Sequence, residues 1–146
     1  MKKYLKNVEE THAFGKTLGS LLQGGEVIEL AGDVGAGKTT FVKGIAEGLA
    51  ITEAVQSPSF TISRVYDGRD GLILAHYDFY RLGDAGIMAD ELHEAVLDPQ
   101  TVTVIEWAEI VEGVLPGERI RIQFSSPSEN ERELDIHGPA NIMEKL

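Results

Sequence analysis

The sequence contains no cysteine among its 146 residues. Disulfides, thiolate metal sites and cysteine nucleophiles are therefore excluded. Glycine and proline number only 16 and 5, too few for a low-complexity or fibrous chain. Long hydrophobic runs are also missing: no stretch approaches the roughly 20 apolar residues of a membrane helix, and the lysines near the amino terminus precede no apolar leader segment. We expect a soluble, cytoplasmic protein with no membrane association.

Positive charge is also scarce. Lysine and arginine together number 13 against 24 aspartates and glutamates, so the formal net charge is −11. A surface with this balance repels the phosphates of nucleic acids and anionic lipids, which argues against independent DNA binding and favours protein partners. The length suits one hydrophobic core, so residues 1–146 are expected to form a single compact domain.

The hydrophobic pattern alternates between helical and strand periods along the chain. The expected elements, in order, are a helix over residues 11–23, a strand over 27–31, a helix through Phe41, Ile45 and Leu49, antiparallel strands over 59–66 and 72–78, a helix over 88–96, a buried strand over 101–106, and a hairpin of strands 120–125 and 133–137. This order predicts an α/β fold with a mixed sheet flanked by helices.

A glycine-rich segment carries the clearest chemical signal. Residues 32–39 read Gly-Asp-Val-Gly-Ala-Gly-Lys-Thr, which fits the P-loop pattern G-x-x-x-x-G-K-[ST], and they lie between an expected strand and an expected helix. Backbone N–H groups in such a loop cradle phosphates, Lys38 is placed for the β and γ phosphates, Thr39 for Mg²⁺, and Thr40 for the α phosphate. The alternative, a plain glycine turn with a solvated lysine, needs neither this spacing nor the Lys-Thr pair.

Acidic residues end two of the expected strands. Glu106 closes the strand 101–106 and Asp78 closes the strand 72–78. A P-loop nucleotidase needs a carboxylate at such a position to hold Mg²⁺ or its waters, and the alternative is an ordinary surface acid at a strand end. His76 lies two residues before Asp78, so both side chains point to one face of the strand, where the histidine is either close to the metal or structural.

Other features restrict the choice of ligand. No Asn-Lys-x-Asp segment is present to read guanine, so ATP is the expected nucleotide, and the four histidines show no zinc-binding spacing. Trp107 either lines the site or packs in the hydrophobic core, whereas Tyr77, Phe79 and Tyr80 are expected to pack on the sheet. Arg81 is the candidate cation beside this aromatic stretch.

Four blocks in this order and spacing resemble the TsaE (YjeE) family of small bacterial P-loop ATPases, which work in forming threonylcarbamoyladenosine at position 37 of tRNA. The blocks are residues 32–41, 57–61 (Ser-Pro-Ser-Phe-Thr), 76–82 (His-Tyr-Asp-Phe-Tyr-Arg-Leu), and 105–107 (Ile-Glu-Trp) with 113–116 (Gly-Val-Leu-Pro) beyond it. The likeness extends over nearly the whole chain and implies a P-loop NTPase-like fold.

The resemblance also implies roles for individual residues. Asp78, Glu106 and Lys38 would act in catalysis, Thr39 and Glu106 would ligate Mg²⁺, and residues 57–61 would sense the γ phosphate. The residues expected to contact ATP are Thr11, Gly35, Ala36, Gly37, Lys38, Thr39, Thr40 and Arg132. Trp107 would lie close to the catalytic centre.

The family's partners are the proteins TsaB and TsaD, and tRNA is held mainly by that assembly. The resemblance therefore implies a weak ATPase whose nucleotide cycle serves the tRNA-modification complex. No arginine finger other than Arg81 is visible in the motifs, which fits slow turnover by the isolated chain. Two alternatives stay open: a binding module that holds ATP without obligatory turnover, and a small-molecule kinase, although no basic lid follows the P-loop.

Overall fold

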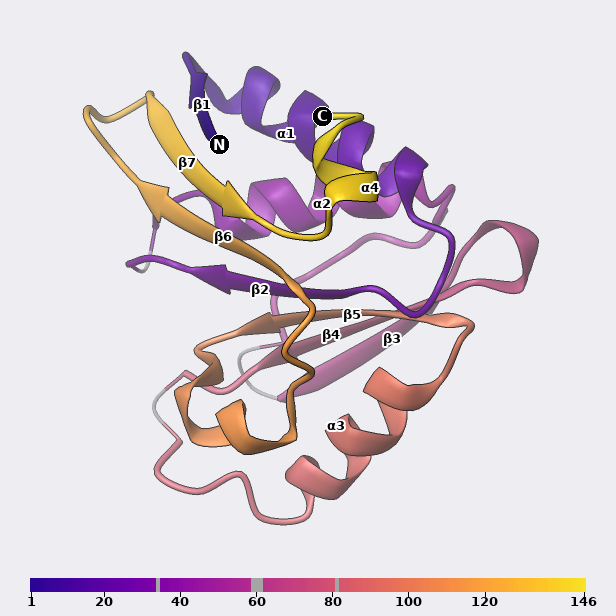
Figure 1. The fold of residues 1–146 in the computed structure, drawn as a ribbon. Coiled ribbons are helices and arrows are strands. Elements are labelled where there is room, and N and C mark those ends of the chain that lie inside the picture. The colour runs from indigo at the N-terminus through magenta and orange to yellow at the C-terminus, as the bar shows by residue number, and fades with distance from the viewer. Residues whose placement is uncertain (34, 59–61, 81) are drawn as a thin grey trace.

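A seven-stranded mixed sheet forms the centre of the protein (Figure 1). The computed structural model describes residues 1–33, 35–58, 62–80 and 82–146. The strands are β1 (Lys2–Leu5), β2 (Val27–Ala31), β3 (Ser63–Asp67), β4 (Ile73–Asp78), β5 (Thr101–Glu106), β6 (Ile120–Ser125) and β7 (Arg132–His137). Their order across the sheet is β1-β7-β6-β2-β5-β4-β3. The four central strands, β6, β2, β5 and β4, run parallel to one another, and antiparallel strands complete both edges.

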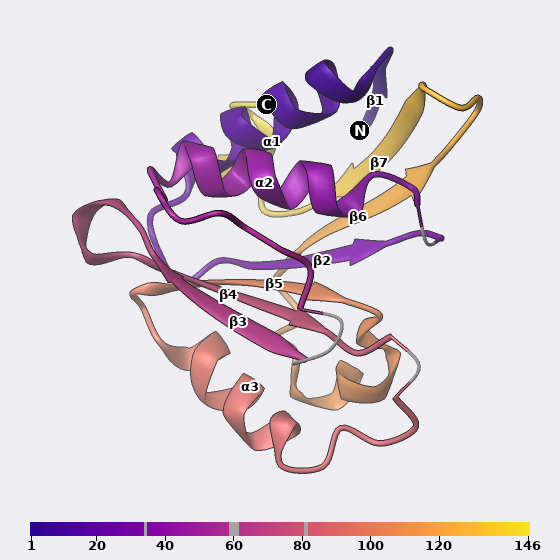
Figure 2. The same ribbon diagram turned by 180° about the vertical axis from the view of Figure 1, so that it is seen from behind.

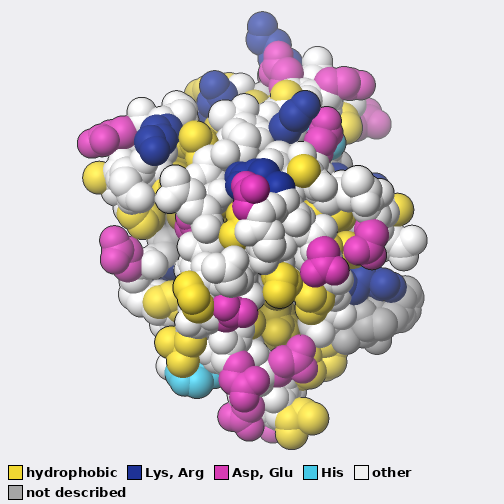
Figure 3. Space-filling view, turned by 90° about the vertical axis from the view of Figure 1, so that its right-hand side faces the viewer, with side chains coloured by type: hydrophobic (Ala, Val, Ile, Leu, Met, Phe, Trp, Pro, Cys, Tyr) yellow, Lys and Arg dark blue, Asp and Glu magenta, His cyan; other side chains and the backbone are white. Residues whose placement is uncertain are grey.

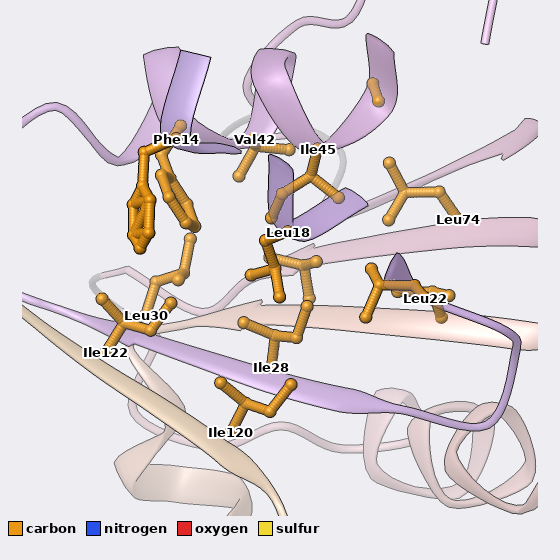
Figure 4. Close-up of a cluster of buried hydrophobic side chains, with 14 of the residues drawn as sticks. Phe14, Leu18, Leu22, Ile28, Leu30, Val42, Ile45, Leu74, Ile120 and Ile122 are labelled. Atoms are coloured by element: carbon orange, nitrogen blue, oxygen red, sulfur yellow. The ribbon is translucent and has the colours of Figure 1, made fainter. Parts of the chain in front are cut away.

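Helices cover the two faces of the sheet unequally (Figures 1 and 2). The helices are α1 (Val8–Leu21), α2 (Lys38–Gly48), α3 (Met88–Leu97) and α4 (Ala140–Met143), with 3-10 segments η1 (Arg69–Gly71) and η2 (Ala108–Val114). The larger core lies between the sheet and the α1, α2 and α4 layer, where side chains such as Leu18, Ile28 and Ile45 interdigitate (Figure 4). The smaller core lies under α3 and η2 and contains Leu92 and Val111.

The parallel centre of the sheet sets the position of the chemistry. Strands β2, β5 and β4 run in the same direction, so their carboxyl ends meet at one edge. The P-loop follows β2 there, while Glu106 ends β5 and Asp78 ends β4. In open α/β sheets this edge is where ligands bind.

Most of the elements expected from the hydrophobic pattern are confirmed. The α/β fold with a mixed, helix-flanked sheet, the strands 27–31 and 101–106, the antiparallel β3–β4 pair and the closing hairpin are all present. The first helix begins at Val8 rather than at residue 11, because the side chain of Asn7 accepts a hydrogen bond from the Glu10 N–H and caps it. Strand β3 begins at Ser63, and the expected positions 59–61 lie outside the described residues.

Strand β1 has no counterpart in the sequence-based expectation. Three of its four residues are exposed, so the apolar alternation that identifies a half-buried strand is missing. Across the described ranges, no helix is long and apolar enough to span a bilayer.

Glycines bring α1 and α2 into backbone contact. A Cβ added at Gly15 would lie 2.4 Å from the Phe41 carbonyl oxygen, and one at Gly19 would lie 2.3 Å from that of Ile45. The reverse contact is equally close, since a Cβ at Gly44 would lie 2.2 Å from the His12 carbonyl oxygen. We refer to this glycine-lined contact as the α1–α2 seam. The two helices therefore lie closer together than they could if these glycines carried side chains.

The seam predicts a large effect of a single methyl group. Gly19→Ala should lower the free energy of unfolding by roughly 1–3 kcal/mol, the usual range for overpacking, although alanine itself favours a helix. Chemical denaturation measures the change. Gly113→Ala is the matched control, because a Cβ there meets nothing within 4 Å. Equal stability of the two variants would contradict close packing at the seam.

Candidate functional site

The loop between β2 and α2 depends on glycine at its ends. Gly32 has φ +139°, and a Cβ there would lie 2.9 Å from the carbonyl oxygen of Phe124 on β6. Gly37 has φ +99° and lies directly before the first residue of α2. The Phe41 N–H donates to the Gly37 carbonyl at 3.0 Å, which starts the helix. The helix therefore begins at the loop with its positive end toward any bound anion.

Lys38 is a buried cation at the start of α2. The residue is 5% exposed, and Nζ donates to the Gly32 carbonyl oxygen at 2.6 Å. Nζ also lies 4.3 Å from the centre of the Trp107 ring and 4.0 Å from Glu106 Oε1. The glycine turn with a solvated lysine, the alternative considered from sequence, does not describe this arrangement.

The two carboxylates lie side by side on adjacent strands. Asp78 and Glu106 are register partners in the β4–β5 pair and are only 7% and 4% exposed. They are therefore not ordinary surface acids. Glu106 Oε2 lies 2.6 Å from Nε2 of His76, and Asp78 Oδ1 accepts a hydrogen bond from the Tyr80 N–H at 2.9 Å.

Burial raises the pKa of Asp78 above its ordinary value. The negative charge of Glu106 also raises this pKa, whereas the Tyr80 N–H, the His76 ring and the charge of Lys38 oppose the shift. Folding therefore shifts the protonation equilibrium of Asp78 toward the neutral acid relative to the unfolded chain. Keeping Asp78 ionised in the folded protein therefore costs free energy, as is common for groups at functional sites.

This pKa shift predicts a pH-dependent gain in stability for Asp78→Asn. A raised folded-state pKa contributes stability that is complete below the unfolded pKa, about 4, and is lost as pH rises through the folded value. The asparagine variant does not incur that loss, so its thermal midpoint should exceed that of the wild type at pH 7 and match it near pH 3. Thermal unfolding of the ligand-free proteins across this range measures the difference. A lower midpoint for the variant at pH 7 would contradict the shift.

A cavity of about 460 Å³ joins these groups. It is lined by Val8, Thr11, Gly35, Gly37, Lys38, Thr39, Thr40, Ser57, Asp78, Tyr80, Glu106, Trp107, Asn130 and Arg132. The lining comes from the first turn of α1, the P-loop, the segment between α2 and β3, the ends of β4 and β5, and the β6–β7 hairpin. Its volume suits a ligand the size of a nucleotide.

The predicted site residues fall into two groups. Most of those expected to contact nucleotide or metal line the cavity, including Thr11 and Arg132, which come from opposite ends of the chain. Ala36 instead packs into the larger hydrophobic core and is 4% exposed. Val34, residues 59–61 of the expected switch, and Arg81 lie outside the described residues.

Arg132 contacts backbone atoms in an arrangement that its sequence context did not indicate. Its guanidinium donates to the carbonyl oxygens of Ser128, Glu129 and Glu131, and also to that of Gly35 at 3.3 Å. These bonds fasten the loop of the β6–β7 hairpin to the P-loop. Arg132 therefore shapes this wall of the cavity.

Sequence reasoning missed several lining residues. Tyr77 and Phe79 are buried and stack with ring centres 6.0 Å apart, as expected for sheet packing. The same expectation is wrong for Tyr80, which faces the cavity and packs 4.8 Å from Trp107. The alternation of side chains in this stretch was the available signal. Val8 and Asn130 lie in no motif, and only the fold brings them to the cavity.

The chemistry of the donors fits a magnesium nucleotide. Mg²⁺ prefers oxygen ligands and is commonly held by one or two carboxylates together with substrate phosphates and water. The cavity offers the Thr39 hydroxyl and the carboxylates of Asp78 and Glu106 beside a buried lysine. Within the described part of the chain, no group of three or more His, Asp or Glu side chains could hold a metal on its own. The residues present are thus suited to a metal that arrives with phosphate.

Comparison with known proteins identifies the family. The sequence profile described as "Threonylcarbamoyl adenosine biosynthesis protein TsaE" matches residues 5–134. The chain belongs to the TsaE family. The matched segment of this TsaE chain includes the P-loop, both carboxylates and strand β6, and it ends within β7.

Individual relatives agree with this assignment over most of their length. The chain is 43% identical to the tRNA threonylcarbamoyladenosine biosynthesis protein TsaE of Bacillus subtilis, covering 96% of this chain and 87% of that protein. It is 38% identical to the protein of the same name from Treponema pallidum, covering 90% and 96% respectively. A crystal structure of Bacillus subtilis YdiB superposes with a TM-score of 0.79 at 37% identity and covers 99% of this chain and 90% of its own.

Proposed function

We propose that this TsaE chain binds and hydrolyses Mg-ATP as a component required for forming the threonylcarbamoyl group on adenosine 37 of tRNA. The observation that carries the proposal is the cavity, in which the P-loop residues Lys38 and Thr39 face two buried carboxylates. The names of the relatives, which specify tRNA threonylcarbamoyladenosine biosynthesis, supply the process.

Different residues of the chain would have different roles in phosphoryl transfer. Mg²⁺, when bound, neutralises phosphate charge and orients the β and γ phosphates. Thr39 and Glu106 would hold the metal, and the loop amides and Lys38 would stabilise the charge that spreads over the transferred phosphoryl group. Asp78, buried beside them, would orient the attacking water or accept its proton.

The surface supports a role that depends on other proteins. The chain carries a net charge of −11, and on the face in Figure 3 its lysines and arginines stand apart with acidic side chains between them. Such a surface is poorly suited to hold tRNA by itself. We propose TsaD and TsaB as the partners, with tRNA contacted mainly through that complex in the cytoplasm.

Partner-stimulated hydrolysis is the expected result of the direct test. Phosphate release from Mg-ATP should be slow for the isolated chain and faster when TsaB and TsaD from the same organism are added. P-loop enzymes that gain a catalytic group from a partner accelerate about 10³-fold or more. The stimulation should disappear with Lys38→Ala.

The controls separate the proposal from its alternatives. Tight ATP binding without phosphate release in any combination would overturn hydrolysis and favour a binding module. Transfer of labelled phosphate to a nucleoside or sugar, rather than to water, would instead show a kinase. GTP in place of ATP tests the choice of base.

A further inference from the structure

His76 is the most deeply buried polar side chain near the proposed site. It lies on β4 with no exposed surface, on the face that packs against α1 and α2. Leu74 precedes it on that face, and Val104 is its register partner on β5. A polar ring in such an apolar layer is unfavourable unless it makes a strong hydrogen bond.

The strong hydrogen bond is to Glu106. His76 Nε2 lies 2.6 Å from Glu106 Oε2. An ionised carboxylate can only accept, so the ring donates through its Nε2–H. The other ring nitrogen, Nδ1, has no hydrogen-bond partner among the described residues. The ring is therefore held in the core with one polar contact, and that contact is to the carboxylate.

This contact makes the two oxygens of Glu106 different. Oε2 is bound by the histidine, whereas Oε1 lies on the side of Lys38, 4.0 Å from its Nζ. Glu106 itself lines the cavity. The ring thus fixes the rotation of the carboxyl group and leaves one oxygen for the ligand.

We propose that His76 is a positioning residue, which holds Glu106 so that Oε1 is the oxygen presented to Mg²⁺. The inference rests on the proposed function, because it assigns a purpose to a contact beside the proposed metal ligand. Groups that hydrogen-bond a metal's carboxylate ligands orient them, and removing such a partner typically costs 10- to 100-fold in metal affinity or activity. His76 would act on the metal only through Glu106.

Two amide variants separate positioning from packing. In His76→Gln the side-chain nitrogen reaches about as far as ring Nε2, whereas in His76→Asn it reaches only about as far as Nδ1. Both variants bury an amide in the same layer. Only the glutamine variant can restore the donor at Glu106 Oε2.

We therefore expect the Mg²⁺ concentration for half-maximal ATP turnover to rise roughly 10- to 100-fold in His76→Asn. In His76→Gln most of the wild-type Mg²⁺ dependence should return, while the nucleotide KM at saturating Mg²⁺ changes little in either variant. Equal impairment of the two variants, or a wild-type Mg²⁺ dependence in His76→Asn, would overturn the inference. A wild type without any Mg²⁺-dependent turnover would instead overturn the proposed function and the metal role together.

A second measurement needs neither turnover nor a stable variant. Long-range ¹H–¹⁵N correlation spectra of the ligand-free wild type report which ring nitrogen of His76 carries the proton. The expected result is an Nε2–H proton, with a resonance that moves in Glu106→Gln. An Nδ1–H tautomer would overturn the inference alone, even in a chain that hydrolyses Mg-ATP.

Discussion

Replacing Lys38 with alanine should reduce ATP turnover by at least about 100-fold, the usual effect of removing one preorganised charge or donor from a transition state. The lysine is held at the start of α2 in a buried position, where its charge is weakly screened. Alanine keeps the helix but leaves the phosphates without this cation. Steady-state phosphate release and nucleotide affinity, measured together, show whether binding or turnover is lost.

Lys43→Ala provides the matched control for this change. Lys43 lies on the same helix, five residues further along, and its side chain is exposed. The control should turn over ATP as the wild type does. Similar losses in both variants would mean that the effect came from the overall charge of α2 and not from the position of Lys38.

Glu106→Gln should have the second large effect, a fall in turnover of roughly 10²- to 10³-fold with ATP binding retained. Glutamine preserves the volume of this buried side chain, and its oxygen can still accept the hydrogen bond from His76. The negative charge that would hold the metal is lost, whereas Lys38 and the loop amides remain for the phosphates. Binding of a fluorescent ATP analogue and phosphate release at increasing Mg²⁺ measure the two properties separately.

Glu109→Gln is the comparison variant, since Glu109 is an exposed acid in the η2 segment that follows. It should show unchanged turnover. Wild-type rates in Glu106→Gln would remove this carboxylate from the proposed reaction and leave Asp78 as the acid to test.

The strands and the P-loop could be predicted because their signals are local. Residues 101–105 are all β-branched, as suits a strand buried on both faces, and the alternation in 120–125 suits a strand buried on one face. The P-loop needs glycine at fixed positions, and all of these positions lie within one short segment of the sequence, residues 32–39. Asp78 and Glu106 could be placed at one edge because parallel strands end together.

The rest of the site depends on contacts between distant segments. Val8 on α1 and Asn130 in the β6–β7 hairpin meet at the cavity only after the sheet has placed β1 and β7 side by side. The bond between His76 and Glu106 joins residues 30 positions apart, and its existence depends on the register of two strands. Sequence could place His76 on the face of Asp78 but could not choose its partner.

The α1–α2 seam has a consequence for how a ligand would be held. Thr11 belongs to α1 and Lys38 to α2, and both line the same cavity. Because the two helices touch backbone to backbone, they form one rigid support for these walls. A molecule that contacts both residues need not order one helix relative to the other. The conformational entropy of that part of the site is lost when the chain folds, so binding there is preorganised.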